Sequence, residues 1–411
     1  TLTDLTRTLI DFGAPGSSVA VDGSPFAVYQ AALTLDGIDA KISSIAALSD
    51  AAPIGYLALG LGGGLLFVIL VVGTLRSSFT LSKLILTFGG ILPAAMMLTG
   101  AVPWQNSDSP GPFLSLLVAA WSVILTALAL LIGRLAQVPD VIAAVAISVA
   151  AFTVDAALGA VMQAGSMLNS RPIFGLRWYG FGNVTFAAYA STGLFLAGYL
   201  AHRFLTAGKR AAAIAAVGTI GFGIVLCEGW PSMGSDFGGI IALTPAVLWL
   251  MLALSGVKIT WPKLLAIAGL AVLAVGLISL LDWLRGPDRR THLGNFVQRV
   301  LDGDALDVIS RKAVAAVETI ASPLGIGSLL IGVMLWIVIM TYLVPRISSD
   351  FTTVRCTLIA ILIVAILGTL LNDGGISVWL TATALVTVVM GWFFLDWAER
   401  SDWTVSALGR T

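Results

Sequence analysis

The feature that most constrains this chain is a series of long apolar segments, many close to twenty residues, separated by shorter polar stretches. An α-helix needs about 20 apolar residues to cross roughly 30 Å of hydrocarbon. The composition agrees, since 58% of the residues are hydrophobic, 11% are charged and the mean hydropathy is +0.98. Because hydrocarbon offers no partner for backbone polar groups, the sequence predicts an all-α, polytopic transmembrane helical bundle and excludes a soluble globular protein.

We predict eleven spans, with the N-terminus outside and the C-terminus inside. Loops on the inner side normally carry the excess of Lys and Arg. Twelve of the 22 Lys and Arg residues follow odd-numbered spans, whereas the loops after spans 2, 6 and 10 carry none. The predicted spans are Ile54–Leu75, Leu84–Val102, Phe113–Gly133, Val141–Met162, Val184–His202, Ala211–Cys227, Gly239–Gly256, Leu264–Leu284, Leu324–Val344, Cys356–Leu371 and Ile376–Trp397.

The same pattern divides the chain into five segments. They are an extracytoplasmic segment (1–50), spans 1–8 with polar outer loops (51–284), an extracytoplasmic loop with an interfacial helix (285–322), spans 9–11 (323–398) and a cytoplasmic tail (399–411).

The loop 285–322 is expected to contain an amphipathic helix. Asp302-Gly303-Asp304 interrupts the segment, and Asp304 is placed to cap the helix that follows. Apolar residues then recur at helical spacing, at Leu306, Ile309, Ala313, Val317 and Ile320. Such a helix lies either along the outer membrane surface or against the bundle, and the sequence leaves both arrangements open.

Charge, cysteine and histidine content exclude several classes of protein. The 22 basic residues balance 22 acidic ones, so no basic field indicates a nucleic-acid partner. Two cysteines and two histidines form no metal-binding motif or disulfide framework. We therefore expect no cofactor in this chain.

Two outer loops carry positive charge against the topology rule. The loop after span 4 contains the stretch FGLRWYGFGN (174–183), with Arg171 shortly before it, and the loop after span 8 contains six basic residues. Either the span count is off by one, the loops are merely solvated, or the charge binds an anion. Arginine presents a planar fork suited to phosphate, and glycine-rich turns expose backbone N–H groups.

The candidate site residues come from four loops on the predicted outer side and one span. Those expected to bind substrate are Arg171, Arg177, Tyr179, Asn183, His292, Arg311 and Lys312. Those expected to order the basic groups, bind a cation or relay protons are Asp155, Glu228, Asp236, Asn372 and Asp373.

Each acidic or polar candidate also has a purely structural interpretation. Asp155 lies inside a span, where a charge is costly, and it could simply pair with Arg171 or Arg177. Glu228 and Asp236 could cap span 7. The stretch NDGG (372–375) could be a hairpin turn, and His292 a surface histidine.

Several short motifs, in order, resemble those of large bacterial envelope proteins. In that family an aspartate is followed by a serine-rich turn and Arg-Phe-Tyr-Gly-x-Gly-Asn; here Asp155 precedes LNSRPIFGLRWYGFGN (168–183). The segments PSMGSDFGG (231–239), THLGNF with ISRK (291–296 and 309–312) and LNDGG (371–375) are similar to its further motifs. The chain departs from the pattern at Val184, where the family usually has glutamate, and at Gly374, where it usually has serine.

The resemblance implies a domain arrangement. Family members carry a sulfatase- or alkaline-phosphatase-like domain outside the membrane, before the polytopic part. The stretches TDLTRTLIDFGAP (3–15) and VDGSPF (21–26) look like the end of such a domain. A divalent metal is then expected in the upstream domain, and the metal-binding residues of that domain are not in this chain.

Three functions follow as alternatives. The first is the membrane module of an envelope hydrolase or phosphoryl-group transferase, which binds an anionic, lipid-linked substrate in an outer-leaflet cleft. The second is a transporter or flippase for an envelope lipid or lipid-linked precursor. The third is a membrane scaffold that holds a partner subunit. Each implies the bacterial inner (plasma) membrane as location and membrane lipids, an upstream phosphatase-like domain or another envelope subunit as partners.

Overall fold

The computed structural model describes residues 39, 42–48, 50–51, 79–168, 180–230, 232–258, 260–287, 290, 292–372 and 374–401. The described part is helical and contains no strand, which confirms the all-α prediction. Its elements are α3 (Phe79–Leu98), η1 (Thr99–Ala101), η2 (Trp104–Asn106), α4 (Pro110–Ala136), α5 (Asp140–Ala157), α6 (Val161–Gly165), α7 (Asn183–Thr206), α8 (Arg210–Gly229), α9 (Phe237–Leu254), α10 (Trp261–Trp283), α11 (His292–Asp302), α12 (Ala305–Ala321), α13 (Pro323–Val338), η5 (Ile339–Leu343), α14 (Val344–Ile347), α15 (Val354–Leu371) and α16 (Ile376–Arg400).

Eight helices in the described part are long and apolar enough to cross a membrane, which makes the chain a membrane protein. They are α3 with η1, α4, α5, α7, α8, α13 continued through α14, α15 and α16. The predicted spans Gly239–Gly256 and Leu264–Leu284 also coincide with helices, α9 and α10, although these are not among the eight. The first predicted span lies outside the described residues, so the count of eleven and the orientation stay predictions.

The boundary predicted for the fourth span is wrong. The helix that was expected to reach Met162 ends at Ala157, and a separate short helix, α6, follows. The break occurs because Gly159 and Ala160 have φ values of +86° and +59°, in the left-handed region that ends an α-helix.

The loop 285–322 contains two helices where the sequence predicted one. The break lies where expected, since Gly303 has a φ of +92° between α11 and α12. Asp304 occupies the N-cap position of α12, but its side chain makes no capping hydrogen bond, so that part of the prediction is wrong. The helix α12 contacts α13, α15 and α16, so one side of it packs against the bundle. Leu306 and Val317, two members of the predicted apolar stripe, stay exposed.

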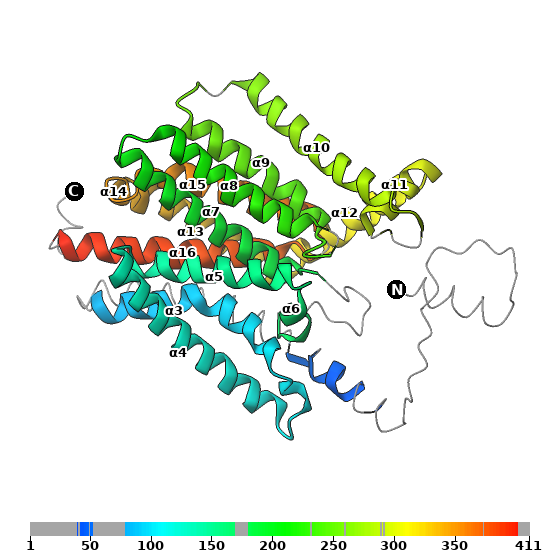
Figure 1. Ribbon diagram of the computed structural model, residues 1–411, viewed down its shortest axis with the longest axis horizontal. Helices are drawn as coiled ribbons and strands as arrows, with labels where there is room; N and C mark the ends of the chain where they lie inside the picture. Colours follow the sequence, from blue (N-terminus) through cyan, green and yellow to red (C-terminus); the bar gives the residue numbers. More distant parts are fainter. Residues whose placement is uncertain are drawn as a thin grey trace, which may run out of the picture.

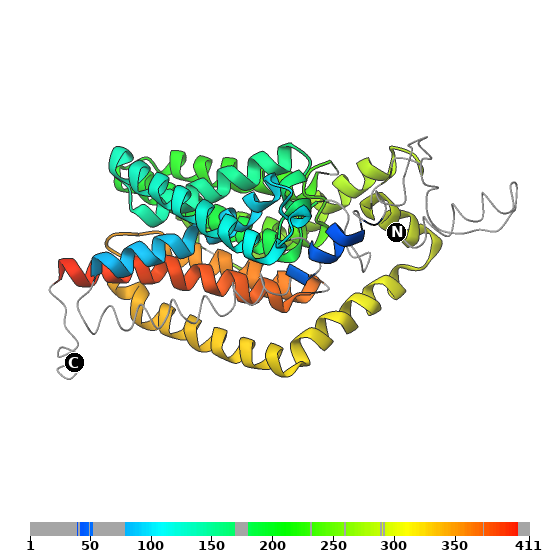
Figure 2. The ribbon, with the colours of Figure 1, turned by 90° about the horizontal axis from the view of Figure 1, so that it is seen from below.

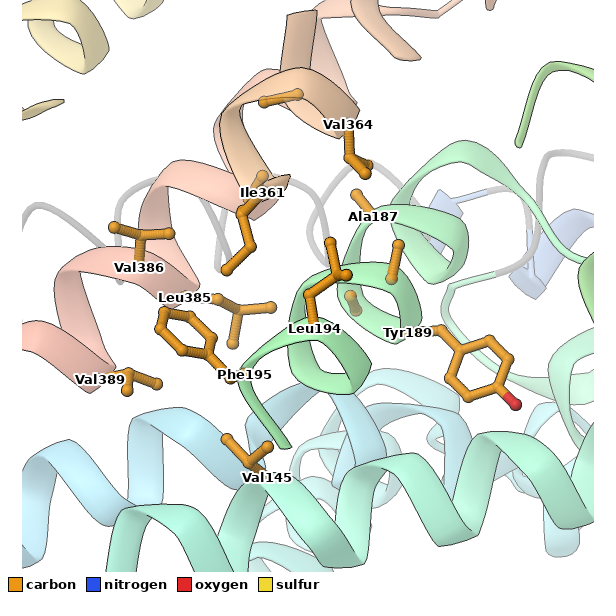
Figure 3. Close-up of a cluster of buried hydrophobic side chains, with 14 of the residues drawn as sticks. Val145, Ala187, Tyr189, Leu194, Phe195, Ile361, Val364, Leu385, Val386 and Val389 are labelled. Atoms are coloured by element: carbon orange, nitrogen blue, oxygen red, sulfur yellow. The ribbon is translucent and has the colours of Figure 1, made fainter. Parts of the chain in front are cut away.

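The centre of the bundle is formed by α7 and α16 (Figures 1 and 2). In each of these helices, 89% of an apolar stretch of 18 residues is buried, compared with 28% in α4. Figure 3 shows how Val145, Phe195, Ile361 and Leu385, from α5, α7, α15 and α16, gather in one apolar cluster. Small residues such as Gly198, which lies against Thr357 of α15, let the backbones approach closely.

Charged side chains connect α3, α16 and the turn before α15 at one end of the bundle. The Lys83 ammonium lies 3.0 Å from a carboxylate oxygen of Asp396 and 2.6 Å from one of Glu399. The Arg400 guanidinium lies 2.7 Å from Asp350 and 2.9 Å from Asp396. Alternation of the helices places α6, α11 and α12 at the opposite end (Figure 1).

The predicted orientation can be tested by cysteine labelling in sealed vesicles of known orientation. Lys209, between α7 and α8, and Asp304, between α11 and α12, are both exposed and lie at opposite ends of the bundle. In a background without Cys227 and Cys356, we expect a membrane-impermeant maleimide to label Asp304→Cys from the outer side and Lys209→Cys only from the inner side. The reverse pattern would invert the topology.

Candidate functional site

Three turns that are distant in the sequence meet at the end of the bundle opposite the ion pairs. The Phe181 amide donates to the Gly234 carbonyl over 2.8 Å, which joins the turn before α7 to the turn before α9. The Asn183 amide nitrogen lies 3.0 Å from the place that a Cβ on Gly374 would occupy. The region where they meet, formed by Asn183, Glu228, Asp236 and Asn372 with the adjoining backbone, is called the polar cluster below.

Two glycines permit this close approach. Gly180 has a φ of +78°, and a Cβ on it would collide with the carbonyl oxygen of Gly234. A Cβ on Gly238 would likewise collide with the side-chain oxygen of Asn372. The glycine-rich motifs of the sequence therefore allow one turn to lie directly against another.

An aromatic group anchors the Gly180–Asn183 turn. The Phe181 ring lies 6.4 Å from Phe152 of α5 and 5.9 Å from Tyr189 of α7, both in edge-to-face contact. The Tyr189 hydroxyl is 2.7 Å from the hydroxyl of Thr153, so the polar end of the ring has a partner. These contacts fix the turn to the C-terminal part of α5 and the N-terminal part of α7.

Three helices begin at the polar cluster. The N-cap residues of α7 and α16 are the glycines Gly182 and Gly375, which have no side chain to cap the helix. The N-cap residue of α9 is Asp236, whose side chain makes no capping hydrogen bond. The N-terminus of a helix carries unsatisfied N–H groups and partial positive charge, which favour an anion. The convergence of three helix N-termini gives the backbone in this part of the bundle a partial positive charge.

Two buried carboxylates lie in the same region. Glu228, near the end of α8, is fully buried, and Asp236 is 1% exposed. Their backbones are joined, because the Asp236 amide donates to the Glu228 carbonyl over 2.7 Å. Asp236 lies at the N-terminus of α9, where the partial positive charge of a helix end favours an acidic side chain. In the part of the chain that the structure describes, no group of three or more His, Cys, Asp or Glu side chains could hold a metal ion.

Asp155 holds the turn between α5 and α6. Its two carboxylate oxygens accept hydrogen bonds from the backbone amides of Met162, at 2.7 Å, and Gln163, at 3.1 Å. The side chain is fully buried, and charge-assisted bonds of this kind are stronger than neutral ones. In the described structure, Asp155 therefore caps α6 and fixes its position.

Gln163 is a residue that the sequence analysis missed. Its side-chain nitrogen donates to the Leu168 carbonyl over 2.9 Å, and its oxygen accepts from the Thr185 hydroxyl over 2.6 Å. It thus connects the Asp155 turn to the first turn of α7. The available signal was an amide side chain directly after a segment predicted to span the membrane, where it requires buried partners.

Several predicted site residues lie outside the described residues. These are Arg171, Arg177, Tyr179 and Asp373, together with the side chains of His292, Arg311 and Lys312. Leu168 and Gly180, which flank the segment 169–179, are both buried. His292 begins α11, and residues 311–312 belong to α12, which contacts α15 and α16.

The two departures from the family pattern have different surroundings. Val184 is 4% exposed and belongs to the apolar core. Gly374 adjoins Asn183, so a serine side chain at that position would crowd the asparagine amide. The glycine thus gives Asn183 room within the polar cluster.

The fold and the polar cluster define a polytopic helical membrane protein with a polar site at one end of its bundle. A scan of protein-family models, a search of curated proteins and a search of solved structures found no match to the chain.

Replacing Asp155 tests whether its role is structural. Asp155→Asn substitutes an NH2 group for one of the two acceptor oxygens and removes the charge that strengthens both bonds. We expect a loss of about 2 kcal/mol in unfolding free energy, measured by thermal unfolding in detergent. Asp108→Asn is the matched control, because Asp108 is an exposed aspartate. An unchanged unfolding temperature in Asp155→Asn, with loss of ligand binding, would assign Asp155 to the site itself.

Proposed function

We propose that this chain is the membrane module of a bacterial cell-envelope protein, located in the inner membrane. The polar cluster binds the phosphate of an anionic, lipid-linked substrate at the outer leaflet. The observation that carries the proposal is the meeting of three helix N-termini with three separate polar turns at one end of the bundle.

Arginines of the segment 169–179 complete the proposed site. In it, Arg171 and Arg177 supply positive charge and bidentate donors to the phosphate. The flanking residues Leu168 and Gly180 adjoin the network and turn that support the polar cluster. In this proposal Asn183 and Asn372 donate their amide N–H groups to the phosphate oxygens.

The chemistry is assigned to a separate domain. The resemblance stated above suggests an alkaline-phosphatase-like domain outside the membrane, which would hydrolyse or transfer the phosphoryl group. A divalent metal in that domain would act as a Lewis acid on the phosphoryl oxygens. The present chain would hold the lipid-linked substrate where such a domain could reach it.

The distribution of charge favours a site at one end over a path through the membrane. In the described helices that are candidate spans, every Asp, Glu, Lys, Arg and His lies within five residues of a helix end. A transporter for an anionic headgroup needs polar groups along its route. This distribution of charge therefore favours a protein that binds the substrate at one end over a protein that transports it.

The test is binding of dioleoyl phosphatidic acid to the purified protein, measured by native mass spectrometry. We expect Arg177→Gln and Arg171→Gln to weaken binding by about tenfold each, or about 1.4 kcal/mol, because each removes a charged phosphate ligand. Arg134→Gln is the control, since Arg134 is exposed at the end of α4 remote from the polar cluster. Equal affinity in all three variants would contradict the proposal.

A further inference from the structure

An apolar groove lies between α9, α10, α11 and α15. Its volume is about 500 Å³, within the range of small-molecule sites. Six of the residues that line it are Ile241, Pro245, Val275, Gly276, Phe296 and Val300. In Figure 1, α10 runs along the edge of the bundle and meets α11 at the end where the polar cluster lies.

The groove is open to the surroundings of the bundle. Val272, which belongs to its wall, is 71% exposed, and Leu273 and Leu277 beside it on α10 are 57% and 51% exposed. In a bilayer, apolar side chains exposed in this way face lipid tails. A hydrocarbon chain can therefore enter the groove from the membrane without crossing water.

The groove adjoins the polar cluster. Gly238, Ile241 and Pro245 follow one another at intervals of three and four residues, so they share one face of α9. Gly238 contacts Asn372 of the polar cluster, and Ile241 and Pro245 line the groove. On α15, Leu367 lines the groove five residues before Asn372, which corresponds to about 7.5 Å along a helix.

One polar group in the groove wall lacks a partner. Ser279 is 4% exposed, and its hydroxyl has no hydrogen-bond partner among the residues that the structure describes. Serines in transmembrane helices commonly bond to a carbonyl four residues earlier, as Ser148 does in α5. The free hydroxyl of Ser279 is therefore available to an acceptor inside the groove, such as an ester carbonyl.

A cation lies one helical turn beyond Ser279. The Arg290 guanidinium stacks over the Trp283 ring, with 4.8 Å to its centroid. It donates to neutral oxygens, the Trp283 carbonyl at 2.9 Å and the Gln298 side chain at 3.1 Å. Its charge complements a phosphate held between the groove and the polar cluster.

We propose that the groove holds one acyl chain of an ester-linked glycerophospholipid. The ester carbonyl accepts the Ser279 hydroxyl, and the phosphate points toward the polar cluster. This assignment rests on the proposed function and narrows its substrate class from any lipid-linked phosphate to a diacyl lipid, as opposed to a polyprenyl phosphate.

The groove can be filled at Gly276 without displacing a neighbour. A Cβ on Gly276 would have no atom within 4 Å, and the same holds for Gly269, seven residues earlier on α10. Both glycines are exposed, but only Gly276 is among the residues that line the groove. We expect Gly276→Phe to weaken binding of dioleoyl phosphatidic acid at least tenfold and Gly269→Phe to leave it unchanged. Equal affinity in the two variants would overturn the assignment of the groove.

Ser279→Ala provides a second test with little steric change. We expect it to weaken binding of dioleoyl phosphatidic acid several-fold and to leave binding of the dialkyl ether analogue unchanged, because the ether lipid has no ester carbonyl. An equal effect on both lipids would overturn the role of Ser279.

The two proposals fail in different ways. If Arg177→Gln weakens binding of a polyprenyl phosphate while Gly276→Phe affects neither lipid, the phosphate site stands and the assignment of the groove fails. If Gly276→Phe weakens binding of dioleoyl phosphatidic acid and Arg177→Gln does not, the groove stands and the proposed phosphate site fails.

Discussion

Backbone hydrogen bonding in a medium without water is the constraint on which this structure depends. A helix satisfies its amides internally, whereas a turn within the membrane region needs partners from the rest of the protein. Here the turns bond to one another and to the end of α8: the Phe181 amide donates to Gly234, the Gly234 amide to Cys227 and the Asp236 amide to Glu228. The polar cluster is thus built around paired backbones, which bring its side chains together.

Close helix packing makes this pairing geometrically feasible. Hydrophobic burial does not drive helices together in lipid, so contacts between small residues carry much of the association. Along α7, Gly193 lies against Ile224 of α8 and Gly198 against Thr357 of α15. These contacts set how near the helix ends at the polar cluster come, and therefore whether the turns can touch.

Periodicity and length were sufficient to predict the helices but not the contacts between them. The helix α9 was predictable from its apolar run, whereas the contact of Gly238 with Asn372 depends on residues 134 positions apart. The end of α5 was missed although Gly159, just past the C-cap residue Leu158, is a usual signal for the end of a helix; the left-handed backbone at Ala160 has no such signal in its side chain. The groove beside Ser279 depends on how α10 and α11 pack against each other, and the hydropathy pattern of one sequence does not predict that packing.

The two ends of the bundle differ in a way that bears on mechanism. At one end, Lys83, Asp396 and Arg400 connect α3, α16 and the turn that contains Asp350 through ion pairs at 2.7–3.0 Å. Alternating access would require that end to open, which would separate these ion pairs. At the other end, the helices leave a groove of about 500 Å³ beside the polar cluster. A bundle fastened at one end and accessible at the other suits the proposed binding of a lipid that enters and leaves on the same side, and the absence of charged residues from the middle of the described spans agrees with that proposal.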